Sequence, residues 1–119
     1  MSDLKVRTKK FGLDVIRLCA SIPHGMEFQI ITRQLMRSAT SVAANYRSAC
    51  RAKSKPDFIN KLSILEEEAD ESSLWLEMLA ELVKRENAEL SRLTKEAGEL
   101  VAIMVSSKKT ARGGDDNKT

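Results

Sequence analysis

The chain has 119 residues, the length of one ordinary domain, and a formal net charge of only +3. Five glycines, two prolines and 4% aromatic residues exclude a β-sandwich or barrel, which needs many tight turns and strand-forming side chains. No apolar run approaches the roughly 18 residues of a membrane span or resembles a signal peptide, so we expect a helical, cytoplasmic protein with no membrane association.

The first predicted helix covers residues 4–21. Its apolar side chains recur at steps of seven, four, three and four, which places them on one helical stripe: Leu4, Phe11, Val15, Leu18 and Ile22. Pro23 and Gly25 follow that stripe, and because proline disfavours helical geometry in the residue before it, we expect a loop there.

The second predicted helix covers residues 27–51 and contains no internal glycine or proline. Its apolar stripe consists of Phe28, Ile31, Leu35, Ala39, Val42, Tyr46 and Ala49. Small residues in the middle of this segment favour a close approach by a neighbouring helix.

The third predicted helix covers residues 56–85. Ser54 and Asp57 have the spacing of a capping box, which indicates a helix start. The stripe that follows alternates steps of four and three, as in a coiled coil: Phe58, Leu62, Leu65, Ala69, Ser72, Leu76, Leu79 and Val83.

The fourth predicted helix covers residues 88–106, with Asn87 as its cap. Its stripe is Leu90, Leu93, Ala97, Leu100 and Met104. Residues 107–119 are small, polar or charged, and we expect a flexible tail. The fold class is therefore all-α, an up-down-up-down four-helix bundle over residues 1–106; a three-helix bundle with a separate fourth helix is the alternative.

Charge is segregated along the chain. Between residues 28 and 61 seven basic residues stand against one acid, and between residues 66 and 89 nine acids stand against two bases. At about 100° per residue, the four arginines of the second helix fit within an arc of about 80°. A row of arginines on one face matches backbone phosphates, so we expect this face and the following basic linker to bind RNA or DNA: Arg33, Arg37, Arg47, Arg51, Lys53 and Lys55. The alternative is that these side chains pair with the glutamates of the third helix, within or between subunits.

A second apolar arc lies on the third helix, about 90° to 150° from its main stripe. It consists of Ile64, Trp75, Met78 and Leu82. Because a helix in a monomeric bundle needs only one buried arc, we expect a homo-oligomer interface at these residues. The alternative is a wider core seam with Trp75 at its edge.

Chemistry on small molecules is not expected. The chain has a single histidine, His24, in a predicted loop. This shortage argues against the histidine-rich ligand sets of di-iron or zinc sites and against any serine or cysteine nucleophile paired with histidine inside one chain. No Gly-rich phosphate loop is present. We therefore predict no catalytic residues, no metal and no cofactor, and a protein that is not an enzyme.

Two segments carry a family resemblance. The stretch QLMRSATSVAAN at residues 34–45 and the stretch SKPDFI at residues 54–59 resemble the bacterial four-helix-bundle proteins encoded within intervening sequences of 23S ribosomal RNA genes. The matching family positions are Arg37, Asn45, Arg51, Ser54, Asp57 and Phe58. Residues 45–49 read NYRSA where many members have NIAEG, which makes this helix more basic than is usual in the family.

The resemblance implies several properties beyond the residues themselves. It implies an up-down four-helix bundle that forms a ring-like homopentamer and has no established catalytic residues. Related accessory proteins of diversity-generating retroelements imply nucleic-acid binding through a basic surface and a protein partner such as a reverse transcriptase.

Overall fold

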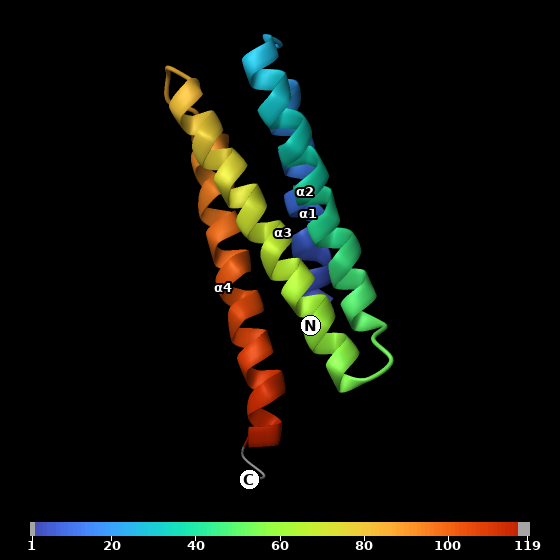
Figure 1. Cartoon of the computed structure of the whole chain (residues 1–119). Coiled ribbons are helices and arrows are strands. Elements are labelled where there is room, and N and C mark those ends of the chain that lie inside the picture. Colours follow the sequence, from blue (N-terminus) through green and yellow to red (C-terminus); the bar gives the residue numbers. More distant parts are fainter. Residues whose placement is uncertain (1, 117–119) are drawn as a thin grey trace.

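The chain folds into four α-helices with short connections. A computed structural model describes residues 2–116, with side chains from residue 3 to residue 113. The helices are α1 (Ser2–Ala20), α2 (Met26–Cys50), α3 (Lys55–Leu82) and α4 (Ala88–Asp116), and the described part of the chain contains no strand. Successive helices run in opposite directions (Figure 1), which confirms the predicted all-α, up-down-up-down bundle.

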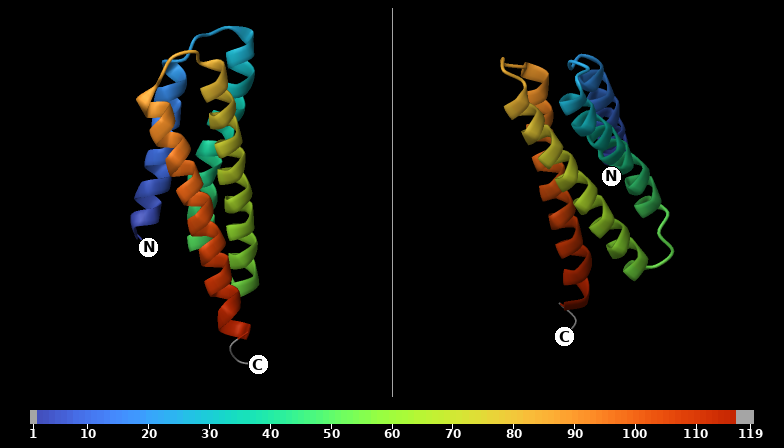
Figure 2. Two further views of the ribbon diagram at one scale, coloured as in Figure 1. Left: turned by 90° about the vertical axis from the view of Figure 1, so that its left-hand side faces the viewer. Right: turned by 45° about the horizontal axis from the view of Figure 1, so that its top comes forward.

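The bundle is long and narrow, with principal extents of 54 × 23 × 21 Å. Contacts join α1 to α2, α2 to α3, α3 to α4 and, least extensively, α1 to α4. Figure 2 shows that α4 continues past the level at which α1 begins, so the end of the bundle near the C-terminus has fewer helices around it.

The core is built from the apolar stripes that the sequence predicts. The stripe residues of α1, α2 and α3 are buried, except that Leu4, Phe28, Phe58 and Val83 are only partly so. Leu90, Leu93, Ala97, Leu100 and Met104 of α4 lie in the same core, which excludes the three-helix alternative. Side chains spaced by three and four residues share one face of a helix, and burying that face accounts for most of the stability of such bundles.

Side-chain caps define two of the helix starts. The backbone N–H of Asp57 donates to the Ser54 hydroxyl at 3.2 Å, and the Asp57 carboxylate accepts from the backbone N–H of Lys53 at 3.0 Å. The Asn87 side-chain oxygen accepts from the backbone N–H of Leu90 at 3.0 Å. Both caps were predicted from the sequence, and each satisfies N–H groups that have no partner within the helix.

Two helix ends differ from the sequence prediction by more than one residue, while α1 and α2 end one residue earlier than predicted. α3 ends at Leu82, three residues early, because Val83 has an extended backbone (φ −76°, ψ 116°). α4 continues to Asp116, whereas a flexible tail was predicted from residue 107; residues 117–119 of that tail lie outside the described residues. The extension has a physical cause, since the Lys108 ammonium lies 2.9 Å from a Glu66 carboxylate oxygen and 3.3 Å from the Ser63 hydroxyl on α3.

Candidate nucleic-acid interface

The arginine row of α2 is exposed along its whole length. Arg33 and Arg47 of α2 and Arg51, which caps the end of the helix, lie on the surface, and none of the three forms an ion pair with a described residue. A guanidinium group without a carboxylate partner keeps its donors for an external anion. Three of the four predicted arginines are therefore available to a ligand.

Arg37 is the exception. Its guanidinium donates to the Glu71 carboxylate and lies 3.6 Å from a Glu68 oxygen, so it bridges α2 to α3. Trp75 Nε1 donates to the same Glu71 oxygen at 3.4 Å. Burial raises the pKa of Glu68 above its usual range, although the nearby Arg37 acts against that rise. Within the protomer, Arg37 therefore follows the alternative prediction, in which an arginine of the second helix pairs with glutamates of the third.

The linker between α2 and α3 and the first residue of α3 add one base each. Lys53 and Lys55 both have exposed side chains. Asp57, the single acid of this region, is held in the helix cap, and the hydrogen bond from the Lys53 backbone is the main reason that its pKa lies below the usual range. Its carboxylate also lies 3.5 Å from the Lys61 ammonium. Asp57 is thus already engaged by its cap and by Lys61.

Helix α1 contributes two bases to the site that the sequence pattern does not predict. Lys5 and Lys9, one turn apart, line a groove of about 500 Å³ between α1 and α2, opposite Arg47. The remaining lining residues are Val6, Thr40, Ala43 and Ala44, so no acid faces the groove. Lys5 also borders a second pocket, of about 630 Å³, at the end of the bundle. The basic surface therefore spans two helices, and only the fold brings its two halves together.

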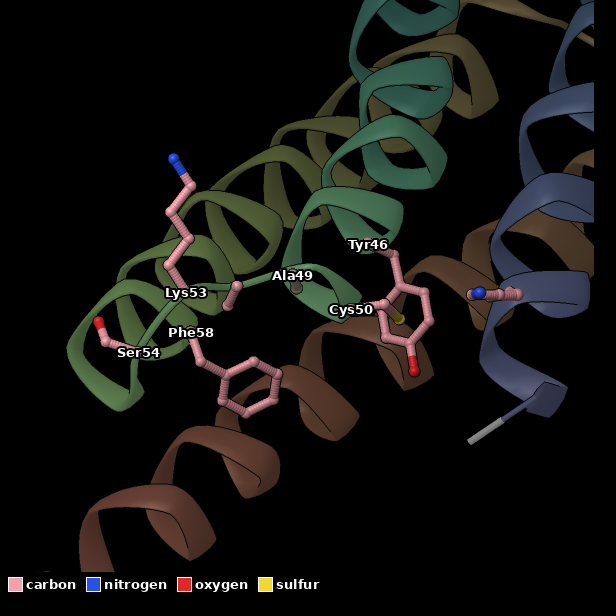
Figure 3. A pocket seen from close by; sticks show the side chains of 8 residues that line it. Tyr46, Ala49, Cys50, Lys53, Ser54 and Phe58 are labelled. Carbon is pink, nitrogen blue, oxygen red and sulfur yellow. The ribbon is translucent and has the colours of Figure 1, made fainter.

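That second pocket has an apolar interior (Figure 3). The rings of Tyr46 and Phe58 line it, whereas the Lys53 side chain extends away from both rings. Tyr46 is buried, and this burial, together with Cys50, raises its pKa to about 12. Its ring packs between helices instead of standing on the surface as a platform for base stacking.

Other bases of α1 are neutralised on the side that faces α4. Arg7 donates to Glu96 at 2.7 and 2.8 Å and to Glu99 at 2.8 Å. These carboxylates raise the pKa of Arg7 further above its already high value. The bases of α1 are therefore divided: the α4 side carries paired charges, and the α2 side carries lysines without an ion-pair partner among the described residues.

A buried acid completes the α1–α4 seam. The side chain of Asp14 is 8% exposed and accepts hydrogen bonds from Lys10 at 2.6 Å, Arg92 at 2.8 Å and Arg17 at 3.2 Å. The bond from Lys10 is the main cause, ahead of Arg92, of an Asp14 pKa lowered to about 2. This network fixes the position of α1 against α4.

The residues predicted for an oligomer interface are divided between the core and the surface. Ile64, Trp75 and Leu82 are half-buried, and the latter two pack against the core, as in the alternative of a wider seam. Met78 is 40% exposed. Leu74 on α3, at 49%, and Met26 and Ile30 on α2, at 77% and 61%, are exposed apolar residues that the sequence analysis did not single out.

The register of α2 against α3 places some of these residues together. Ile30 lies seven residues before Arg37, and Met78 lies seven residues after Glu71. Because the two helices run antiparallel and Arg37 pairs with Glu71, both steps lead two turns in the same direction on the same face. Ile30 and Met78 are therefore level with each other on the outer face of the α2–α3 seam.

Within the described residues, no group of three or more His, Cys, Asp or Glu side chains is placed to hold a metal ion.

Cys19 is a buried free thiol whose burial raises its pKa to about 11, and Cys50 is a free, exposed thiol. In the described part of the chain, every helix is too short or too polar to cross a lipid bilayer.

Comparison with known proteins finds a matching family and a similar solved structure. The family model described as 23S rRNA-intervening sequence protein matches residues 2–106. A crystal structure of a protein of unknown function from the S23 ribosomal protein family of Bacteroides thetaiotaomicron is similar, with a TM-score of 0.80 and 29% sequence identity. The similarity covers 89% of this chain and 98% of the other. No curated protein matches the chain.

Proposed function

This chain belongs to the family of 23S rRNA-intervening sequence proteins, and we propose that it is a non-enzymatic protein that binds the backbone of RNA or DNA. The binding surface is the exposed face of α2 and the linker after it. Its residues are Arg33, Arg47, Arg51, Lys53 and Lys55, with Arg37 in a supporting role because it already bridges to α3.

One observation carries this proposal: Arg33 and Arg47 of α2 and the C-cap residue Arg51 stay exposed without an ion-pair partner among the described residues, although α3 presents many glutamates. Arg33 and Arg51 are separated by 18 residues, or about 27 Å of helix, which is enough to meet several phosphates. Phosphate contacts of this kind supply affinity without sequence preference.

We further propose that the protein acts as a homo-oligomer, in the form of a ring-like pentamer. Exposed apolar side chains on α2 and α3 support this assembly, with Met78 and Ile30 at the same level of one face. The half-buried Ile64, Trp75 and Leu82 form the base of that surface. Repetition around a ring multiplies the basic face of each protomer, so several weak phosphate contacts act together.

The second candidate function is a scaffold that binds a protein partner, such as a reverse transcriptase, with the basic residues used in salt bridges between subunits. The Arg37–Glu71 pair supports it, because it shows that an arginine of α2 pairs with a glutamate of α3 when the two are close. Glu67, Glu77 and Glu81 on α3 are exposed and available for the same contact between subunits.

A salt titration tests the main proposal. Fluorescence anisotropy with labelled RNA and DNA is measured over a range of salt concentrations for the natural chain and for Arg47→Glu/Arg51→Glu. Four or five phosphate contacts predict a log–log slope of about −3 to −4.5, and the double variant is expected to lose most of its binding. Lys84→Glu/Arg85→Glu is the matched control, since it makes the same change of charge in the loop between α3 and α4.

Two results would decide against nucleic-acid binding: an affinity independent of salt, or equal losses in the variant and its control. Light scattering tests the assembly on the same samples. A monomer at micromolar concentration would contradict the proposed ring, and recovery of a stable protein complex that survives nuclease treatment would favour the scaffold.

A further inference from the structure

The groove between α1 and α2 has the composition of an anion site. Its rim carries Lys5 and Lys9 from one helix and Arg47 from the other, and its floor is formed by Val6, Thr40, Ala43 and Ala44. We propose that this groove is the main phosphate-binding site of the protein and that its ligand is the backbone of a nucleic-acid duplex. The inference rests on the proposed function, which it extends from α2 to α1 and narrows to one class of ligand.

The charge pairing around α1 supports this assignment. Arg7, Lys10 and Arg17 all have carboxylate partners from α1 or α4. Lys5 and Lys9 form no ion pair with a described residue, and neither does Arg47 across the groove. Three cations from two helices thus converge on a groove that no acid lines, and their mutual repulsion is relieved when an anion enters.

The floor of the groove permits a close approach. Alanine side chains at positions 43 and 44 leave the surface of α2 low between the basic residues. The Thr40 hydroxyl is turned to its own helix, where it donates to the carbonyl of Met36 at 2.7 Å. A sugar-phosphate strand can lie on such a floor while Lys5 and Lys9, about 6 Å apart along α1, reach its phosphates.

The position of the aromatic rings determines the class of nucleic acid. Proteins that bind single strands combine a basic groove with aromatic side chains on which the bases stack. Here Phe11 and Tyr46 are buried in the core, and Phe28, Phe58 and Trp75 pack against it. These are all five aromatic residues of the chain, and none lines the groove. The site therefore contacts phosphates and not bases, and a duplex offers the denser array of phosphates.

The experiment compares two sets of lysines. Lys5→Gln/Lys9→Gln removes the α1 half of the rim, and Lys95→Gln/Lys109→Gln removes two exposed lysines from α4 as a matched control. Ala44→Glu is a second variant, which places a carboxylate in the groove without removing a base. Circular dichroism and thermal unfolding confirm that each variant is folded.

The probes are a labelled RNA duplex, a labelled DNA duplex and one labelled strand of each. We expect the groove variants to bind both duplexes at least about tenfold more weakly, and the lysine pair to make the salt slope shallower by about 2. The control is expected to match the natural chain. The duplex that binds more tightly identifies whether RNA or DNA is the source of the backbone. Either result supports the assignment of the groove as the binding site.

Different results would overturn the inference and the proposed function. If Arg47→Glu/Arg51→Glu loses binding while the lysine and Ala44 variants keep it, the groove is not the site, although the protein still binds nucleic acid. If a single strand binds more tightly than the duplex, the assigned class of ligand is wrong. If the natural chain binds none of the probes, the proposed function fails together with the inference.

Discussion

The hydroxyl oxygens of Ser38 on α2 and Ser72 on α3 lie 2.8 Å apart in the fully buried centre of the bundle. Each also contacts a carbonyl of its own helix, with Ser38 at 3.2 Å from the Leu35 oxygen and Ser72 at 2.9 Å from the Glu68 oxygen. Ser72 is the one polar position in the heptad-like stripe of α3, and Ser38 is its partner.

The two serines are expected to be coupled energetically. Ser38→Ala and Ser72→Ala should each lower the free energy of unfolding by about 1 kcal/mol, because each change leaves the other hydroxyl without its partner across the seam. The double variant should lose less than the sum of the two. Urea unfolding of all four proteins gives the coupling energy, and strictly additive losses would show that the pair contributes nothing as a pair.

Asp14 should make stability depend on pH in the acidic range. Its pKa in the folded protein, about 2, lies below the value of about 3.9 for an unfolded aspartate. Its stabilisation is therefore complete above about pH 4 and is lost as the pH falls towards 2. Asp14→Asn should lower the free energy of unfolding at neutral pH by about 1 to 2 kcal/mol and flatten the profile between pH 4 and 2.

The control for this prediction is Asp70→Asn, which removes an exposed carboxylate of α3. Its stability at neutral pH should stay within about 0.5 kcal/mol of the natural chain. Equal pH profiles for Asp14→Asn and the natural chain would contradict the assigned role of Asp14.

Two glycines within helices should respond differently to larger side chains. A Cβ at Gly98 meets no atom within 4 Å, so Gly98→Ala should stabilise α4 by about 0.5 to 1 kcal/mol. A Cβ at Gly12 lies 3.5 Å from the Ala39 carbonyl oxygen, an ordinary contact, so alanine is accommodated where α1 approaches α2. Gly12→Leu should destabilise the bundle by about 1 to 3 kcal/mol, because its side chain must separate the two helices. Thermal unfolding compares Gly98→Ala, Gly12→Ala and Gly12→Leu, and a stable Gly12→Leu would contradict the close approach.

The cap of α4 should contribute measurably to stability. Asn87→Ala removes the acceptor of the Leu90 N–H and should lower the free energy of unfolding by about 1 kcal/mol. Asn87→Ser keeps a capping oxygen and should retain most of the stability. Denaturant unfolding distinguishes the two, and equal losses would mean that the change acts on the loop and not through the cap.

Arg37 and Arg47 should have separable effects. Arg37→Ala frees Glu71, so the fluorescence of the single tryptophan, Trp75, should change, while duplex binding falls by only about twofold. Arg47→Ala should leave that fluorescence unchanged and weaken binding by about tenfold, because it removes a phosphate contact. The opposite order of affinities would place the binding surface on the α2–α3 side of the helix.

The fold was predictable because apolar spacing determines which face of each helix is buried. The four stripes, the Ser54 and Asn87 caps and the helix order all follow from local patterns. The helical structure of α4 beyond residue 106 was not predictable from the sequence. It is supported by the ion pair between Lys108 and Glu66, which lie 42 residues apart in the chain. The polar composition of residues 107–119 by itself predicts a flexible tail. The ion pair that stabilises the helix there forms only in the folded bundle.

The candidate site was only partly predictable. The arginine row follows from helical periodicity, but its division into a bridging Arg37 and an exposed Arg47 depends on which residues of α3 lie opposite. Lys5 and Lys9 belong to a helix whose charges are mixed in sequence, so no local pattern separates them from the paired Arg7 and Lys10. The nearest signal in the sequence is the spacing of four residues between Lys5 and Lys9, which places both on one face of the first helix.

The uneven pairing of charge also has a consequence for motion in solution. Unpaired bases lie over the α1–α2 groove, whereas exposed acids such as Glu67, Glu77 and Glu81 lie on α3, which stands diagonally across the bundle from α1. The molecule therefore has an electric dipole across its short dimension. Near a charged polymer, that dipole rotates the protein before any contact forms, so encounters begin with one side already facing the polymer and become faster as the ionic strength falls.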